Sequence, residues 1–242
     1  MKRTTILLLL LTLSYGVFAQ LADEDAFYFG FKVGASKSDI SNVKQTIIRD
    51  FFPESTYSTL DESAYGGLGG MFFYYRFPGS FLALQPELVY AQGGSKFSYQ
   101  DINDLTYRMN FEYQYFQLST LLKVYPLADY SEVLAGLNIF LGPQFSANVA
   151  SEKITYTSNS DVNGQDLQIQ QNLRGVLKGS SDFMLVGGIG FEIGRFIFDA
   201  RYNLGLKDNI ETMANGYNFI ENKNSGKSIQ VSIGYAIPFD QF

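Results

Sequence analysis

The chain has 242 residues, with 24 acidic and 18 basic side chains and a net charge of −6. It contains neither cysteine nor histidine, which excludes a disulfide framework and removes the usual thiol nucleophile and imidazole base from any enzyme mechanism. An acidic chain of this kind is a poor candidate for binding nucleic acid.

The N-terminus has the pattern of a secretory signal peptide. Lys2 and Arg3 precede an uninterrupted apolar run over residues 6–11, and residues 17–19, V-F-A, form an A-x-A-like cleavage site. We therefore expect residues 1–19 to be a signal peptide that is removed on export.

The mature chain, residues 20–242, is expected to form one all-β domain. No later segment approaches the roughly 18 consecutive apolar residues of a transmembrane helix, which excludes a helical membrane protein. The chain nevertheless contains 17 Tyr and 22 Phe with no Trp, as the aromatic girdles of a membrane β-barrel would require. Without Lys2 and Arg3 there are 16 basic and 24 acidic residues, a net charge of −8.

Eight stretches alternate between apolar and polar residues with a period of two, and turn residues or polar segments bound each of them. This period predicts β-strands. In chain order the predicted strands are residues 27–36, 64–77, 82–97, 111–125, 133–147, 183–193, 196–204 and 228–239.

The last predicted strand shows the alternation most clearly. Its odd-numbered residues, from Ile229 to Phe239, are all apolar, whereas its other face carries Ser, Gln, Gly and Ala until Pro238. A soluble sandwich would turn such an apolar face inward, and a strand of a membrane barrel would turn it outward to lipid.

The charged residues decide between these two arrangements. Unpaired charges cannot occupy the core of a soluble sandwich, so the apolar faces are predicted to form the exterior. In lipid, only a closed barrel satisfies the backbone groups of every strand. Seven charged residues share the faces opposite the apolar ones: Lys32, Arg76, Glu87, Lys123, Glu192, Asp199 and Arg201.

Long and short connections alternate along the chain. The short turns fall near Gly79, Ala128 and Gly194. This alternation predicts an eight-stranded antiparallel up-and-down transmembrane β-barrel of the bacterial outer membrane, with short periplasmic turns, both termini in the periplasm and long extracellular loops. The predicted loops are residues 37–63, 99–109, 148–181 and 207–227.

With the strands in place, the chain resembles the PorT-like outer-membrane β-barrel family of the Bacteroidetes. The matching segments mark strands and turns over nearly the whole mature chain. The founding members of that family act as accessory components of type IX secretion, so the resemblance implies a role in the envelope or in that secretion pathway. The segments are F-Y-F-G-F-K-V-G-A-S, L-A-L-Q-P-E-L-V-Y-A-Q-G-G, Y-F-Q-L-S-T-L-L-K-V-Y-P, L-G-P-Q-F, F-M-L-V-G-G-I-G-F-E-I-G and G-Y-A-I-P-F.

The seven inward charges form the most chemically suggestive set in the sequence. They could form a binding site or a proton path, or a salt-bridge network that fills a narrow lumen. We favour the network, because an eight-stranded barrel is just wide enough for its own side chains and must compensate these charges whatever its role. A filled lumen also argues against a general diffusion pore.

The sequence predicts no catalytic, cofactor-binding or metal site. The glycine clusters at residues 66–70 and 187–190 lack the phosphate-loop motif and lie within strands. The oxygen-bearing side chains of Asn159, Asp161, Asn163 and Asp166 do not match a calcium-binding loop. No motif assembles Asp, Ser and Tyr into a catalytic group.

Two functional classes remain. The first is a non-enzymatic barrel whose external loops or periplasmic rim contact an envelope or secretion protein. The second is a small-molecule binder or narrow channel that uses the charged lumen. Outer-membrane lipid and the outer-membrane assembly machinery are expected partners of either class.

The C-terminus resembles the signal that outer-membrane assembly machinery reads, with Tyr235, Phe239 and Phe242 as its candidate residues. The same residues could instead form only the periplasmic aromatic girdle, and both roles are compatible.

The substitution Phe239→Arg separates the two roles. A lipid-facing charge near the interface costs only about 0–1 kcal/mol, so a girdle role alone predicts a mild effect. We expect Phe239→Arg to lower outer-membrane levels sharply in cells, by immunoblot of membrane fractions, while the purified variant still refolds in detergent. Near-normal cellular levels would refute the assembly signal.

Overall fold

The computed structural model describes residues 27–41, 58–100, 106–128, 134–159, 164–179, 181–208, 210–212 and 225–239. The expected signal peptide and the terminal Phe242 lie outside the described residues. In this part of the chain, no helix is long and apolar enough to cross a membrane.

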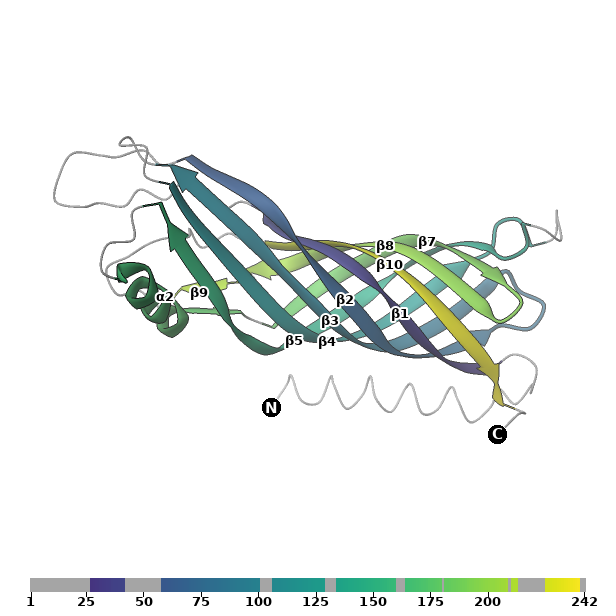
Figure 1. The fold of residues 1–242 in the computed structure, drawn as a ribbon. Helices are drawn as coiled ribbons and strands as arrows, with labels where there is room; N and C mark the ends of the chain where they lie inside the picture. The colour runs from purple at the N-terminus through teal and green to yellow at the C-terminus, as the bar shows by residue number, and fades with distance from the viewer. Residues whose placement is uncertain are drawn as a thin grey trace.

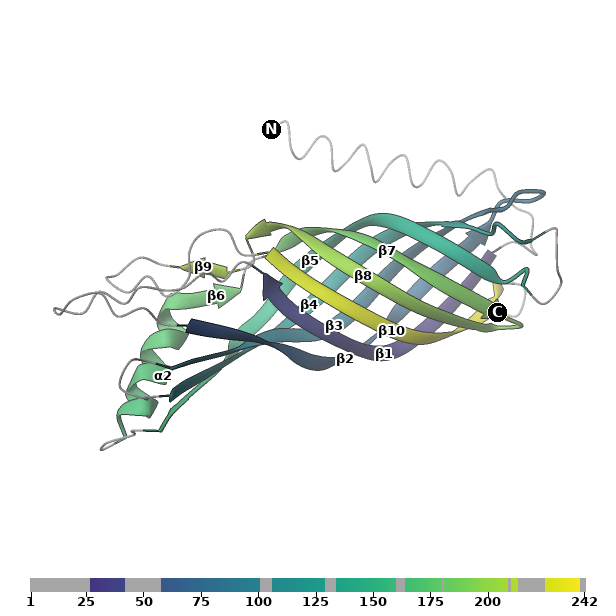
Figure 2. The ribbon, with the colours of Figure 1, turned by 90° about the horizontal axis from the view of Figure 1, so that it is seen from above.

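Eight antiparallel strands form a closed barrel, as the sequence predicts (Figures 1 and 2). Around the ring the order is β1-β10-β8-β7-β5-β4-β3-β2, so every strand pairs with the preceding and following barrel strand and the last pairs with the first. The barrel strands are β1 (Phe27–Ser41), β2 (Ser58–Arg76), β3 (Leu82–Gln100), β4 (Thr106–Val124), β5 (Leu137–Ser158), β7 (Asp182–Ile193), β8 (Phe196–Asp208) and β10 (Ser225–Pro238).

The two ends of the barrel differ in how they connect the strands. Tyr28 lies opposite Pro238, so the first strand begins and the last strand ends at the same end, here called the turn end. Two turns at this end contain glycines in the left-handed region, Gly79 with φ of 65° and Gly194 with φ of 57°, which glycine adopts without strain. The opposite end is called the loop end.

The side chains alternate between the exterior and the lumen as predicted. On β10, Ile229, Val231 and Ile233 are 40–53% exposed, whereas Gln230 between them is only 3% exposed. On β8, Tyr202 is exposed and Arg201 is buried. The apolar faces therefore form the outer surface, and the polar and charged faces form the interior.

Four strands continue beyond the barrel wall at the loop end. Strand β1 pairs with β2 only as far as Ala64, and β7 pairs with β5 only as far as Ser146. Beyond these points β2, β3, β4 and β5 still pair with one another, and they form a projecting sheet (Figure 2). Register shifts in β2 and β5 lie where this sheet leaves the barrel, since bulges bend a strand.

The projecting sheet corrects the predicted strand and loop boundaries. Predicted loop residues in all four loop-end connections belong to strands, and the β3–β4 connection shrinks from 99–109 to 101–105. Strand β5 begins at Leu137 rather than at residue 133, after a turn over residues 134–136. Hydropathy marks where a strand leaves lipid, whereas strand pairing continues wherever backbone partners and Thr, Tyr or Ser side chains allow it.

The predicted loops also contain short elements that the sequence analysis missed. Helix α2 (Gln165–Val176) follows β5 and leads into β6 (Leu177–Gly179). Strand β6 pairs with β9 (Ile210–Thr212), which lies in the β8–β10 connection. Asp166 in the first turn of α2 and Arg174 in the last turn complement the helix dipole.

Aromatic rings gather on the exterior at the turn end. The Phe239 ring lies 4.9 Å from Phe27, and the Tyr235 ring lies 5.3 Å from Phe196. These contacts are consistent with a girdle role for Tyr235 and Phe239, and their role in assembly remains a prediction.

Candidate functional site

The centre of the lumen is built around Glu87 on β3. Arg201 on β8 donates two hydrogen bonds to its carboxylate, at 2.6 and 3.0 Å, and the Lys32 ammonium on β1 donates a third at 2.8 Å. Gln85 and Ser119 add bonds of 2.6 and 3.3 Å. A bidentate guanidinium with further donors is the geometry that best compensates a buried carboxylate.

Asp199 connects this centre to the next group of charges. Its Oδ2 lies 2.9 Å from Lys32 Nζ and 3.0 Å from Arg201 Nη2, and its Oδ1 lies 3.7 Å from Lys123 Nζ. Asp199 and Arg201 are two residues apart on β8, so strand alternation places both in the lumen. Each therefore pairs with the other and with side chains from other strands.

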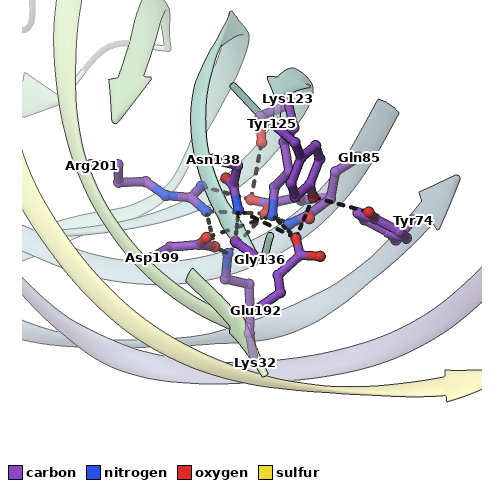
Figure 3. Close-up of polar contacts among 12 residues, drawn as sticks. Lys32, Tyr74, Gln85, Lys123, Tyr125, Gly136, Asn138, Glu192, Asp199 and Arg201 are labelled. Atoms are coloured by element: carbon purple, nitrogen blue, oxygen red, sulfur yellow. Dashed lines mark hydrogen bonds and ion pairs between the residues drawn. The ribbon is translucent and has the colours of Figure 1, made fainter. Parts of the chain in front are cut away.

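Glu192 on β7 accepts hydrogen bonds from a third set of side chains, which lies toward the turn end of the lumen (Figure 3). Its Oε1 accepts hydrogen bonds from Lys123 Nζ at 3.0 Å and from the Tyr125 hydroxyl at 2.5 Å. The Tyr125 and Tyr74 hydroxyls lie 2.9 Å apart. Arg76 makes no ion pair with any described residue, and its guanidinium carbon stacks 4.5 Å from the centre of the Tyr125 ring.

Six of the seven predicted residues therefore form one connected set of ion pairs, called the lumen network. It contains three cations and three anions, and only Glu192 has a side chain more than 3% exposed. Such balance is required, because an uncompensated charge in this environment costs several kcal/mol. The members are Lys32, Glu87, Lys123, Glu192, Asp199 and Arg201.

The network spans the full width of the barrel. In the ring order, β3 and β8 are separated by three strands on either side, so Glu87 and Arg201 come from diametrically opposite walls. Glycines make room for the side chains between those walls. A Cβ at Gly190 would lie 2.6 Å from Asn138 Oδ1 and 3.0 Å from Asp199 Oδ1, so a larger residue there would displace members of this layer.

An aromatic layer closes the lumen at the turn end, below the network. Phe72, Tyr74 and Tyr125 pack there with Ala83, Ile197 and Ala236, and all six are at most 6% exposed. At the loop end, beyond the network, the lumen is polar, with Asp182 buried there and Gln230 donating to Gln117 at 3.2 Å. A cavity of about 40 Å³ lies at that end.

The tyrosines and amides of this site were not among the residues predicted to form the charge network. Tyr125 could have been found, since it lies two residues after Lys123 and shares its face. Tyr74 belongs to a strand whose facing the sequence pattern leaves open, because aromatic residues occupy both faces of residues 71–77.

In the oxygen-rich segment that was considered for calcium binding, the described side chains accept hydrogen bonds from the protein itself. Asp166 accepts hydrogen bonds from the Ser158 backbone N–H and hydroxyl, and Asn159 Oδ1 accepts one from the Thr106 N–H. Asp161 and Asn163 lie outside the described residues. Among the described residues, no group of three or more His, Cys, Asp or Glu side chains is placed to hold a metal ion.

A closed eight-stranded barrel with an apolar exterior and a charged, filled lumen defines a small outer-membrane β-barrel protein. The sequence profile of the family described as "Outer membrane protein beta-barrel domain" matches residues 18–211, and the chain belongs to this family. The protein is therefore located in the bacterial outer membrane, as the sequence predicts.

Solved structures of similar barrels come from several bacteria. Neisserial surface protein A is 12% identical, with 86% of this chain and 96% of that chain covered and a TM-score of 0.41. OprG from Pseudomonas aeruginosa is 14% identical, with 88% and 97% covered and a TM-score of 0.40. Ail of Yersinia pestis is 10% identical, with 88% and 99% covered and a TM-score of 0.34. No curated protein matches the chain in sequence.

Removing one cation from the lumen network should destabilise the barrel. Arg201→Leu leaves Glu87 and Asp199 with two cations instead of three, and breaking a buried pair typically costs about 3–5 kcal/mol. We expect a loss of that size in the free energy of unfolding, measured by urea titration of the barrel in lipid vesicles. Arg195→Leu, at an exposed turn-end arginine, is the matched control. Equal stability of the two variants would contradict the network's structural role.

Proposed function

We propose that this protein is a non-enzymatic outer-membrane barrel that does not conduct and that acts through contacts at its loop end or its periplasmic rim with another envelope protein. The observation that carries the proposal is the closure of the lumen by ion pairs across its full diameter. A barrel whose interior is filled in this way has its accessible chemistry at its two ends.

The filled lumen argues against transport. Any solute that crosses would have to separate Glu87 from Arg201, and both side chains are at most 3% exposed. Separating a buried ion pair without replacing its partners costs several kcal/mol. The aromatic layer around Phe72 and Tyr125 closes the same path a second time.

The loop end offers the larger surface for a partner. The projecting sheet and α2 carry polar side chains beyond the apolar band of the barrel, and α2 exposes Leu167, Gln168 and Gln171. These polar side chains can contact a protein outside the membrane, whereas the barrel wall faces lipid.

The pathway we propose is envelope assembly or type IX secretion, in which the protein would be an accessory component. The support is the resemblance of the strand and turn segments to the PorT-like barrels of the Bacteroidetes.

We also propose that assembly machinery reads the C-terminal residues Tyr235, Phe239 and Phe242. The absence of His and Cys from the sequence supports a role without catalysis.

A second candidate function is binding of a small molecule in the lumen. The observation that favours it is the cavity at the loop end, which includes Ser36, Tyr113, Gln117 and Asp182 in its lining. It lies above the lumen network, so a ligand would enter from the loop end and remain there. This arrangement supports a binder rather than a narrow channel.

Two measurements test the proposal. In planar bilayers we expect no discrete conductance from the purified barrel, and stable single-channel steps would contradict a closed lumen.

In cells, a photo-crosslinking amino acid at Gln168 or at Arg195 probes the loop end and the turn end, and one at lipid-facing Ile189 is the control. We expect an adduct with an envelope or secretion protein from one of the first two positions. No adduct above the Ile189 control would contradict the proposed contact with an envelope protein. Unimpaired type IX secretion in a deletion strain would contradict the proposed role in that pathway.

A further inference from the structure

The edge of β5 outside the barrel is covered by side chains instead of a strand. Strand β7 pairs with β5 only over Leu137–Ser146, whereas β4 pairs with the other side of β5 as far as Ser158. Among the described residues, the last part of β5 therefore has a paired strand on one side only. A bare edge of this kind readily pairs with another chain, and proteins usually protect it.

Helix α2 supplies the cover. The Tyr156 N–H donates to Gln170 Oε1 at 3.1 Å, and the Ser158 N–H donates to Asp166 Oδ2 at 2.5 Å. At the barrel side, Arg174 Nε donates to the Ile154 carbonyl at 3.3 Å. These three backbone groups belong to alternate residues of β5, which direct their hydrogen bonds to the same side of a strand.

The repeat of the helix matches the repeat of the strand. Asp166, Gln170 and Arg174 are four residues apart, and four helical residues rise about 6.0 Å. Two strand residues advance about 6.6 Å, so one helix face stays in step with every second residue from Ser158 back to Ile154. The helix runs antiparallel to β5 and occupies the place of a fifth strand of the projecting sheet.

The covered segment is itself well suited to strand pairing. Residues 154–158 read I-T-Y-T-S, a run of β-branched and aromatic residues without charge, glycine or proline, which favours pairing. Ile154 is fully buried and Tyr156 is 7% exposed, so every second side chain of the segment is packed against the protein. The backbone pattern it offers is that of a preformed edge for β-strand addition.

The geometry points to a docking site at this edge: an extended polypeptide segment of a partner protein pairs with Ile154–Ser158 of β5 by displacing α2. The occupant is a polypeptide strand, because the groups that α2 satisfies are backbone N–H and C=O groups at strand spacing. The helix is held by side chains and by the short β6–β9 pairing, so it can be exchanged without opening the barrel. The inference deepens the proposed function, since it names the surface on which an envelope protein would dock.

The test uses the full chain folded in detergent and a peptide that copies β4 residues 106–112, T-Y-R-M-N-F-E. This sequence already pairs with the opposite side of the same β5 segment, with Met109 opposite Tyr156. The variant Asp166→Ala/Gln170→Ala/Arg174→Ala removes the cover. The variant Gln168→Ala/Gln171→Ala is the matched control, because these residues are exposed on the same helix and their side chains make no hydrogen bond with described residues.

We expect amide exchange at Tyr156 and Ser158 to accelerate at least tenfold in the triple variant, and the labelled peptide to bind it at least tenfold more tightly than it binds the wild type or the control, by fluorescence anisotropy. A scrambled peptide should not bind. Unchanged exchange would show that α2 is not the cover, and faster exchange without peptide binding would overturn the docking site. If the triple variant does not fold, Gln170→Ala alone removes the hydrogen bond from the Tyr156 N–H to Gln170 and is judged by the same two readouts. The assay contains no envelope protein, so its failure is distinguishable from failure of the proposed function.

Discussion

The ion pair between Glu87 and Arg201 is the interaction on which the interior of this barrel depends. It joins walls that are diametrically opposite in the ring of eight strands, and Lys32 and Asp199 attach to it from the sides. A charge in so narrow an interior must be compensated, so each cation in the lumen network requires an anion on another strand. The ion pairs therefore form only if the strands have the correct register, and the pairs in turn stabilise that register.

The closed interior moves the accessible chemistry of the molecule to its ends. On the turn-end side of the network the lumen is filled by Phe72, Tyr74 and Tyr125, and on its loop-end side a small cavity lies among described residues such as Gln117 and Asp182. The barrel wall is apolar and meets lipid. The surfaces that remain for recognition are the turn-end rim and the projecting sheet with α2, which is where we place the function.

The sequence predicts the barrel well because two simple patterns coincide. Period-two alternation identifies the strands, and charges such as Lys32 and Asp199 opposite the apolar residues identify which face points inward. The sequence predicts the loop-end boundaries of the strands less well. Polar residues were taken to mark the start of a loop, but polar residues can continue to pair as strands. Residues 153–158 read as a polar loop, although they are paired throughout with β4. Helix α2 is too polar to show an apolar face, and only its Asp166-Gln170-Arg174 spacing hints at its contact with β5. Which charges pair across the lumen depends on the closure of the ring, which no single strand encodes.

A double-mutant cycle between Glu87 and Arg201 measures how much their ion pair contributes to the stability of the barrel. The free energy of unfolding in lipid vesicles would be measured for the wild type, Glu87→Leu, Arg201→Leu and the double variant. Each single replacement unbalances the network, whereas the double replacement leaves two cations and two anions. Replacing both members of a buried pair is often nearly neutral, and residues in contact couple by about 0.5–3 kcal/mol. We expect the double variant to be more stable than either single variant. A double variant whose loss of stability equals the sum of the two single losses would contradict a stabilising pair between Glu87 and Arg201.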